Sequence, residues 1–272
     1  MLDVAMRVIF KAAITVLTVC LLLAGISSGQ MRRRSLNNNV DRPEAEFHLV
    51  RLIYGGGLSG LGGFSGFFNN WWAIDYPEAE EHFLPALRRM TTMSVADDSA
   101  HLEITDDRIF QFPFLFMQQV GQGNWQPGDR EAERMREYLL RGGFLMVDDF
   151  HGPYEWDLFQ RSMRRVLPDR TIVDIPEDDA LMHIFYDLDQ RTQIPGRRHL
   201  RMGRGGQVVA QMAGPPRWRG IYDDHKRLMV AINFNMDMGD SWEHADDPVY
   251  PAAMTGLAYR FGVNYVIYAM TH

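Results

Sequence analysis

Cysteine is almost absent from this chain. One cysteine, Cys20, occurs in 272 residues, and it lies inside an apolar run close to the N-terminus. We expect the chain to be cut after Gly29, which would leave the mature protein with no cysteine. The folded domain is therefore predicted to contain no disulfide, no thiolate metal site and no cysteine nucleophile.

A long hydrophobic run is also lacking. The apolar run at residues 12–25 has 14 residues, whereas a membrane span needs about 20. Basic residues precede the run and small residues follow it, which is typical of a signal peptide over residues 1–29. The residues of this pattern are Arg7, Lys11, Ser27 and Gly29. We expect export to the periplasm, with membrane contact only through this N-terminal segment.

Retention of this segment as an anchor in the inner membrane is the alternative. Arginines at positions 32 to 34 place positive charge on the far flank of the run, where it complicates the orientation of an anchor. Residues 30–46 are polar without an apolar period, so they are predicted to form a linker. A single domain is expected over residues 47–272, since 46% hydrophobic residues suffice for one sizeable core.

An excess of positive charge is missing too. The chain has 28 Lys and Arg against 35 Asp and Glu, a formal net charge of −7. Proteins that bind nucleic acids are usually basic, so the sequence predicts no nucleic-acid partner.

The domain alternates between short apolar runs and longer amphipathic stretches. This alternation is typical of an α/β fold with a mostly parallel sheet and helices on both faces. The expected strands are residues 47–54, 101–105, 112–117, 144–148, 171–175, 220–222 and 227–235. The expected helices are residues 77–89, 130–141, 156–167 and 251–270. Residues 190–217 are rich in Arg, Gly and Pro with little period, which predicts an extended surface excursion.

Four motifs carry a resemblance to a known family. They are FHLVRLIY at residues 47–54, WAIDYP at 72–77, GGFLMVDDF at 142–150 and GIYDD at 220–224. Together they resemble the bacterial domain-of-unknown-function family DUF4159, from about residue 47 to the C-terminus. That family in turn resembles the class I glutamine-amidotransferase-like superfamily, which implies a flavodoxin-like sheet.

The resemblance also shows where this chain departs from the superfamily. There, a Gly-Gly pair leads into a strand that presents a cysteine nucleophile on a tight turn, or a histidine in trehalose-utilisation-like relatives. Here the strand after Gly142-Gly143 leads to Asp148-Asp149, so hydrolysis of glutamine through a thioester is excluded. His183 is similar to the family's histidine, although members often have His-Pro where this chain has Asp179-Ala180.

Candidate catalytic residues follow from where the strands end. In an open α/β sheet, ligands bind beyond the carboxyl ends of the strands. The resulting candidates are Asp149 and His151, to which the resemblance adds His183, with Asp149 as a general base or a ligand of a hard cation. The alternative is that Asp148 or Asp149 caps the turn or helix that starts near Gly152.

A glycine-rich loop at residues 55–76 supplies candidate binding residues. Seven glycines precede a series of aromatic residues, so the loop could be a lid with a sugar-stacking or protein-binding surface. Equally, its aromatic residues could pack over the end of the sheet. The predicted ligand-binding residues here and at the other strand ends are Trp71, Trp72, Asp75, Tyr76, Asp148, Asn235 and Asp237.

Sequence motifs for metals and cofactors are lacking. No His-x-x-x-His spacing, calcium-loop template or phosphate-loop lysine occurs, so we expect no metal and no cofactor. Two functions stay open. The first is a non-catalytic envelope module that binds a saccharide or a protein partner. The alternative is a hydrolase that uses Asp149, with or without a metal, and His151 or His183 as the proton carrier.

Overall fold

A computed structural model describes residues 45–55, 71–205 and 207–272. The predicted signal peptide, nearly all of the predicted linker and most of the glycine-rich loop lie outside these residues. Within the described part of the chain, no helix has both the length and the apolar character needed to cross a bilayer.

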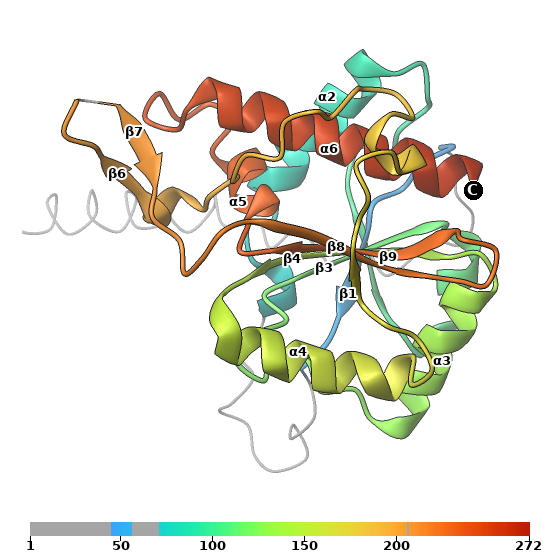
Figure 1. Ribbon diagram of the computed structural model, residues 1–272. Coiled ribbons are helices and arrows are strands. Elements are labelled where there is room, and N and C mark those ends of the chain that lie inside the picture. The colour runs from blue at the N-terminus through green and yellow to red at the C-terminus, as the bar shows by residue number, and fades with distance from the viewer. Residues whose placement is uncertain (1–44, 56–70, 206) are drawn as a thin grey trace, which may run out of the picture. The chain divides into compact units, whose positions relative to one another are not determined.

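A seven-stranded sheet forms the centre of the domain, in the order β2-β1-β3-β4-β9-β8-β5 (Figure 1). The first five strands in this order are mutually parallel, whereas β8 runs antiparallel to both β9 and β5. The strands are β1 Val50–Ile53, β2 Ala100–Glu103, β3 Phe114–Gln118, β4 Phe144–Phe150, β5 Val173–Asp174, β8 Arg217–Tyr222 and β9 Leu228–Phe234. The predicted α/β class with a mostly parallel sheet is confirmed.

Helices cover both faces of the sheet (Figure 1). On one face lie α2 Glu78–Met90, α5 Met238–Glu243 and α6 Ala252–Thr271, and on the other α3 Asp129–Leu140 and α4 Gly152–Val166. Each layer encloses its own apolar core, because alternate side chains of the buried strands point to opposite faces. Short 3-10 turns complete the domain: η2 Trp71–Ala73, η3 Asp107–Gln111, η4 Ala180–Met182 and η5 Arg197–His199.

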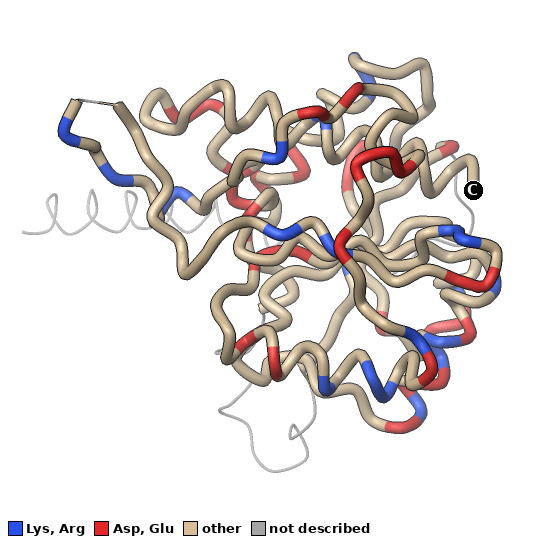
Figure 2. The backbone as a smooth tube through the Cα atoms, viewed as in Figure 1, with Lys and Arg blue, Asp and Glu red and all other residues tan. Residues whose placement is uncertain are grey.

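The segment predicted as an extended surface excursion, residues 190–217, contains two short strands. Its strands β6 Leu200–Met202 and β7 Val208–Ala210 pair antiparallel in a separate two-stranded sheet. Figure 2 shows arginines but no acidic residues along this hairpin.

Candidate functional site

A cleft of about 270 Å³ opens beyond the carboxyl ends of β3, β4 and β9. It brings together three residues that the sequence singles out, Asp75, Asp149 and Asp237. This is the edge at which parallel sheets bind ligands. The remaining lining residues are Ile74, Gln119, Arg197, Arg198, Asp240 and His244.

The backbone around the cleft adopts the left-handed conformation at four residues other than glycine. The φ angles are 62° at Asp75, 50° at Gln119, 53° at Asp149 and 59° at Asn235. A Cβ atom makes this conformation unfavourable, and such residues cluster at functional sites. At Asp149 the pairing register between β4 and β9 also shifts, which turns this residue out of the regular ladder.

Asp149 is held by three side chains. Its Oδ1 atom lies 2.8 Å from Nε2 of His151 and 3.9 Å from a guanidinium nitrogen of Arg198. Its Oδ2 accepts a hydrogen bond from the amide of Gln119. The predicted capping role of Asp149 is wrong, because the amide of Gly152 donates instead to Asn235. Asp149 therefore faces the cleft as part of a carboxylate–imidazole pair.

Asp148 has a different role from its neighbour. It is fully buried, and its Oδ2 accepts hydrogen bonds from the amides of Met238 and Gly239, at 2.6 and 3.0 Å. Asp148 thus caps the first turn of α5, not the turn near Gly152, and it does not line the cleft. Burial raises the pKa of Asp148 to about 7, with a further contribution from the charge of Asp149 and opposition from the two amides.

This pKa shift predicts how stability depends on pH. Between about pH 4 and pH 7 the folded protein holds the proton on Asp148 that the unfolded chain has lost, so the free energy of unfolding should decrease as the pH rises. The variant Asp148→Asn cannot titrate and should show a shallower decrease. Urea unfolding at several pH values, in chelator, measures both slopes. Identical slopes would show that Asp148 is ionised in the folded protein throughout this range.

Two acids in the cleft also resist ionisation. Burial and the charge of Asp149 raise the pKa of Asp75 and of Asp237 well above the usual value. Oδ1 of Asp237 accepts the amide of Asp240 at 3.0 Å, so Asp237 is the N-cap of α5. Neutral carboxyl groups of this kind can act as proton donors.

A buried arginine fixes the position of Asp75. Arg51 forms an ion pair with Glu80 and donates to Oε1 of Gln118 at 2.6 Å. The amide nitrogen of Gln118 then donates to Oδ2 of Asp75 at 2.6 Å. Arg51 also binds the carbonyl of Ile74 at 2.8 Å. Core contacts therefore set the geometry on this side of the cleft.

Three further candidate residues have structural contacts. The side chain of Asn235 accepts a hydrogen bond from the amide of Gly152 and donates one to the carbonyl of Pro215. It therefore connects the turn after β4 with the segment before β8. Trp72 is only 5% exposed and packs edge-on against His101 at 5.2 Å. Tyr76 also contacts that ring, at 4.6 Å. The indole of Trp72 belongs to the core, which agrees with the alternative that the aromatic residues of the loop pack over the end of the sheet. Trp71, by contrast, is 37% exposed.

His183 lies outside the cleft. It follows η4, and its ring contacts Asp187 and the carbonyl of Glu177, at 2.9 and 2.8 Å. The expectation that it joins Asp149 is not met, since the segment after β5 packs against α6 instead.

Other residues that line the cleft or lie beside it were missed from the sequence. Gln119 directly follows the apolar strand β3, a position at which a polar residue signals the ligand edge. His199 lies edge-on to His151, with ring centroids 5.2 Å apart, and burial together with His151 lowers the pKa of His199. It belongs, with Arg197 and Arg198, to a segment whose aperiodic sequence gave no indication of a site.

Two groups of three described residues could hold a cation. In the first, Asp149, His151 and Asp237 offer ligand atoms within 4.8 Å of one another. In the second, Asp240, Glu243 and His244 do the same. The first group joins distant segments, so no spacing motif in the sequence could have predicted it.

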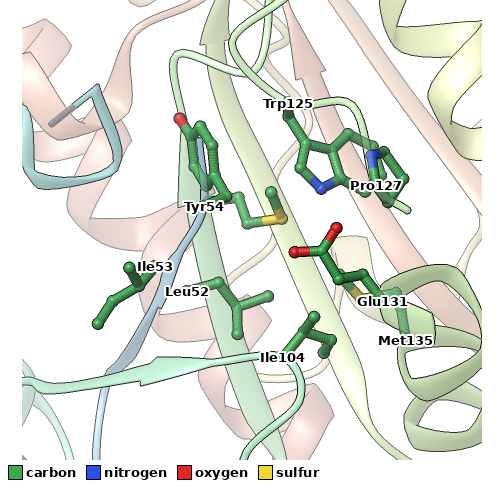
Figure 3. A pocket seen from close by; sticks show the side chains of 9 residues that line it. Leu52, Ile53, Tyr54, Ile104, Trp125, Pro127, Glu131 and Met135 are labelled. Atoms are coloured by element: carbon green, nitrogen blue, oxygen red, sulfur yellow. The ribbon is translucent and has the colours of Figure 1, made fainter. Parts of the chain in front are cut away.

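A second hollow lies between β1, β3 and α3 (Figure 3). Its lining is mainly apolar and includes Leu52, Tyr54 and Trp125. Its volume of about 10 Å³ leaves room for no more than about one water molecule. The cleft at Asp149 is therefore the better candidate for a ligand site.

Comparison with known proteins identifies the family of the chain. No curated protein matches the chain. The family model described as domain of unknown function DUF4159 matches residues 48–270, which is most of the chain. The chain therefore belongs to the DUF4159 family.

Proposed function

We propose that the protein is an exported hydrolase of the cell envelope that uses Asp149 to activate water against a saccharide or a related envelope substrate. The observation that carries the proposal is the pair of Asp149 and His151, 2.8 Å apart at a left-handed turn beside the cleft. The signal-like N-terminal sequence supports export.

His151 and Asp75 can supply different functions beside Asp149. A carboxylate can only accept hydrogen bonds, so Nε2 of His151 is the donor in this pair and orients Asp149. Asp75 lines the same cleft, and its raised pKa favours the neutral acid that could protonate a leaving group. An activated water and a proton donor are the two requirements of hydrolysis.

We infer in addition a flavodoxin-like sheet of the class I glutamine-amidotransferase-like superfamily. The five parallel strands follow the order second, first, third, fourth, fifth, which is the flavodoxin-like order. Asp149 then occupies the region in which the superfamily presents its nucleophile. The absence of a thiol from the domain favours activated water over an acyl-cysteine intermediate.

Two histidines provide a matched test of this proposal. His151→Gln should lower turnover by about 10–100-fold because it removes the donor that orients Asp149, whereas His183→Gln should leave turnover unchanged. Hydrolysis is measured with nitrophenyl glycosides, nitrophenyl acetate and isolated cell-wall saccharide. Equal loss in both variants, or in neither, would contradict the assigned role of His151.

Binding without turnover is the second candidate function. The exposed indole of Trp71 favours it, because Trp71 lies three residues before Ile74 in the wall of the cleft. An exposed aromatic ring can stack on a sugar or anchor a protein partner. A shift in tryptophan fluorescence with cell-wall saccharide, in the absence of any product, would favour this candidate over the hydrolase.

A further inference from the structure

The cleft concentrates carboxyl groups with little positive charge beside them. Four aspartates line it, namely Asp75, Asp149, Asp237 and Asp240. Of the two lining arginines, Arg197 is already paired with Asp247 at 2.6 Å, and Arg198 approaches Asp149 only to 3.9 Å. Buried carboxylates in such proximity are stabilised by protons or by a cation.

We propose that Asp149, His151 and Asp237 form a binding site for one divalent metal ion. Their ligand atoms lie within 4.8 Å of one another. The ion would take the place of the proton between Nε2 of His151 and Oδ1 of Asp149, whose separation of 2.8 Å is close to the roughly 3.0–3.4 Å expected between neighbouring ligands on one ion. The three side chains are therefore close enough to share one ion.

Asp237 supplies an independent indication of a ligand. The residue is only 3% exposed, and its Oδ1 is used by the amide of Asp240. Its Oδ2 accepts no hydrogen bond from any residue in the described part of the chain, although Asp237 lines the cleft. A carboxylate on so buried a residue is costly to ionise, and a bound cation removes that cost.

Gly196 keeps the space beside this oxygen open. A Cβ atom at position 196 would lie 2.4 Å from Oδ2 of Asp237 and 3.0 Å from Oδ2 of Asp240. It would also lie 3.2 Å from Nδ1 of His199. This nitrogen and Nδ1 of His151 are both buried without a partner among the described residues. A side chain at position 196 would therefore require these polar atoms to shift, whereas glycine leaves them their positions beside the cleft.

The ligand set indicates which ions to expect. One imidazole with two carboxylates suits Zn²⁺ or Mn²⁺ better than Mg²⁺ or Ca²⁺, which prefer oxygen ligands alone. Three protein ligands leave a coordination position for water. The second group, Asp240, Glu243 and His244, is the weaker candidate because Oδ2 of Asp240 already accepts the amide of Arg197.

The site deepens the proposed function and rests on it for its chemistry, because a bound ion would lower the pKa of the water that Asp149 helps to hold. Binding of the ion is itself independent of any substrate. The metal site and the hydrolase can therefore be tested separately. Ion binding without hydrolysis would support the metal site and contradict the hydrolase. Full hydrolysis in chelator would support the hydrolase and contradict a role of the metal in it.

Calorimetric titration of the chelator-treated intact chain with Mn²⁺ and with Zn²⁺ tests the proposal. We expect one ion per chain for wild type and for Asp246→Asn, whose carboxylate is 82% exposed. Asp237→Asn should weaken binding by about 100-fold or more. Asparagine retains the N-cap of α5, so thermal unfolding should verify that this variant is folded. The Mn²⁺ electron paramagnetic resonance spectrum should show nitrogen coordination that His151→Gln removes.

The second group of ligands supplies the competing outcome. Glu243→Gln should leave the affinity for both ions unchanged. Loss of binding in Glu243→Gln with full binding in Asp237→Asn would move the ion to the second group and overturn the proposal. Absence of saturable binding by folded wild type would overturn it as well.

Discussion

Replacement of Asp149 by asparagine should reduce hydrolysis by about 10²–10⁴-fold, the range associated with loss of an acid–base residue. Asparagine has nearly the same shape, but it can neither take a proton nor bind a cation with a full negative charge. It also tolerates the φ of 53° at this position, which an alanine would strain. The free energy of unfolding should therefore change little.

Rate and stability have to be measured on the same preparation. Asp246→Asn removes an exposed acid elsewhere and should match wild type in both measurements. If Asp149→Asn unfolds at a much lower urea concentration while folded molecules keep their hydrolytic rate, Asp149 is a structural residue. The pair of Asp149 and His151 would then have no role in catalysis.

Adjacent tryptophans should differ strongly in their effect on stability. Trp72→Ala should lower the free energy of unfolding by about 3–5 kcal/mol because it leaves a cavity in the core. Trp71→Ala should change it by no more than about 0.5 kcal/mol, since this side chain is partly exposed. Urea unfolding followed by circular dichroism measures both without depending on the indole signal. Similar losses in the two variants would contradict the assignment of Trp72 to the core and Trp71 to the surface.

Much of the fold could be predicted from local patterns. Continuous apolar runs indicate β3, β4 and β9 because strands of a parallel sheet are buried on both faces. The start of α4 was predicted too far along the chain. The helix predicted from residue 156 begins at Gly152, because Pro153 in the first turn favours a helix start. The short helix α5 was missed, since six residues give too little periodicity to recognise.

The location of the site was also predictable, but its composition was only partly so. The acidic pair at the end of β4 marks the ligand edge of the sheet, and the structure separates the two acids into a cap and a cleft residue. Local sequence could not show that His183 packs near α6, or that Asp237 comes close to Asp149. These relations depend on how distant segments pack.

The most direct measurement of the central claim is product formation from isolated cell-wall saccharide in water labelled with ¹⁸O. Wild type and Asp149→Asn are compared by mass spectrometry under identical conditions. The account predicts one labelled oxygen per bond cleaved by wild type, and product from the variant at about the level of the enzyme-free blank. Unlabelled product, equal product from both proteins, or no product from wild type would contradict a hydrolase that activates water at Asp149.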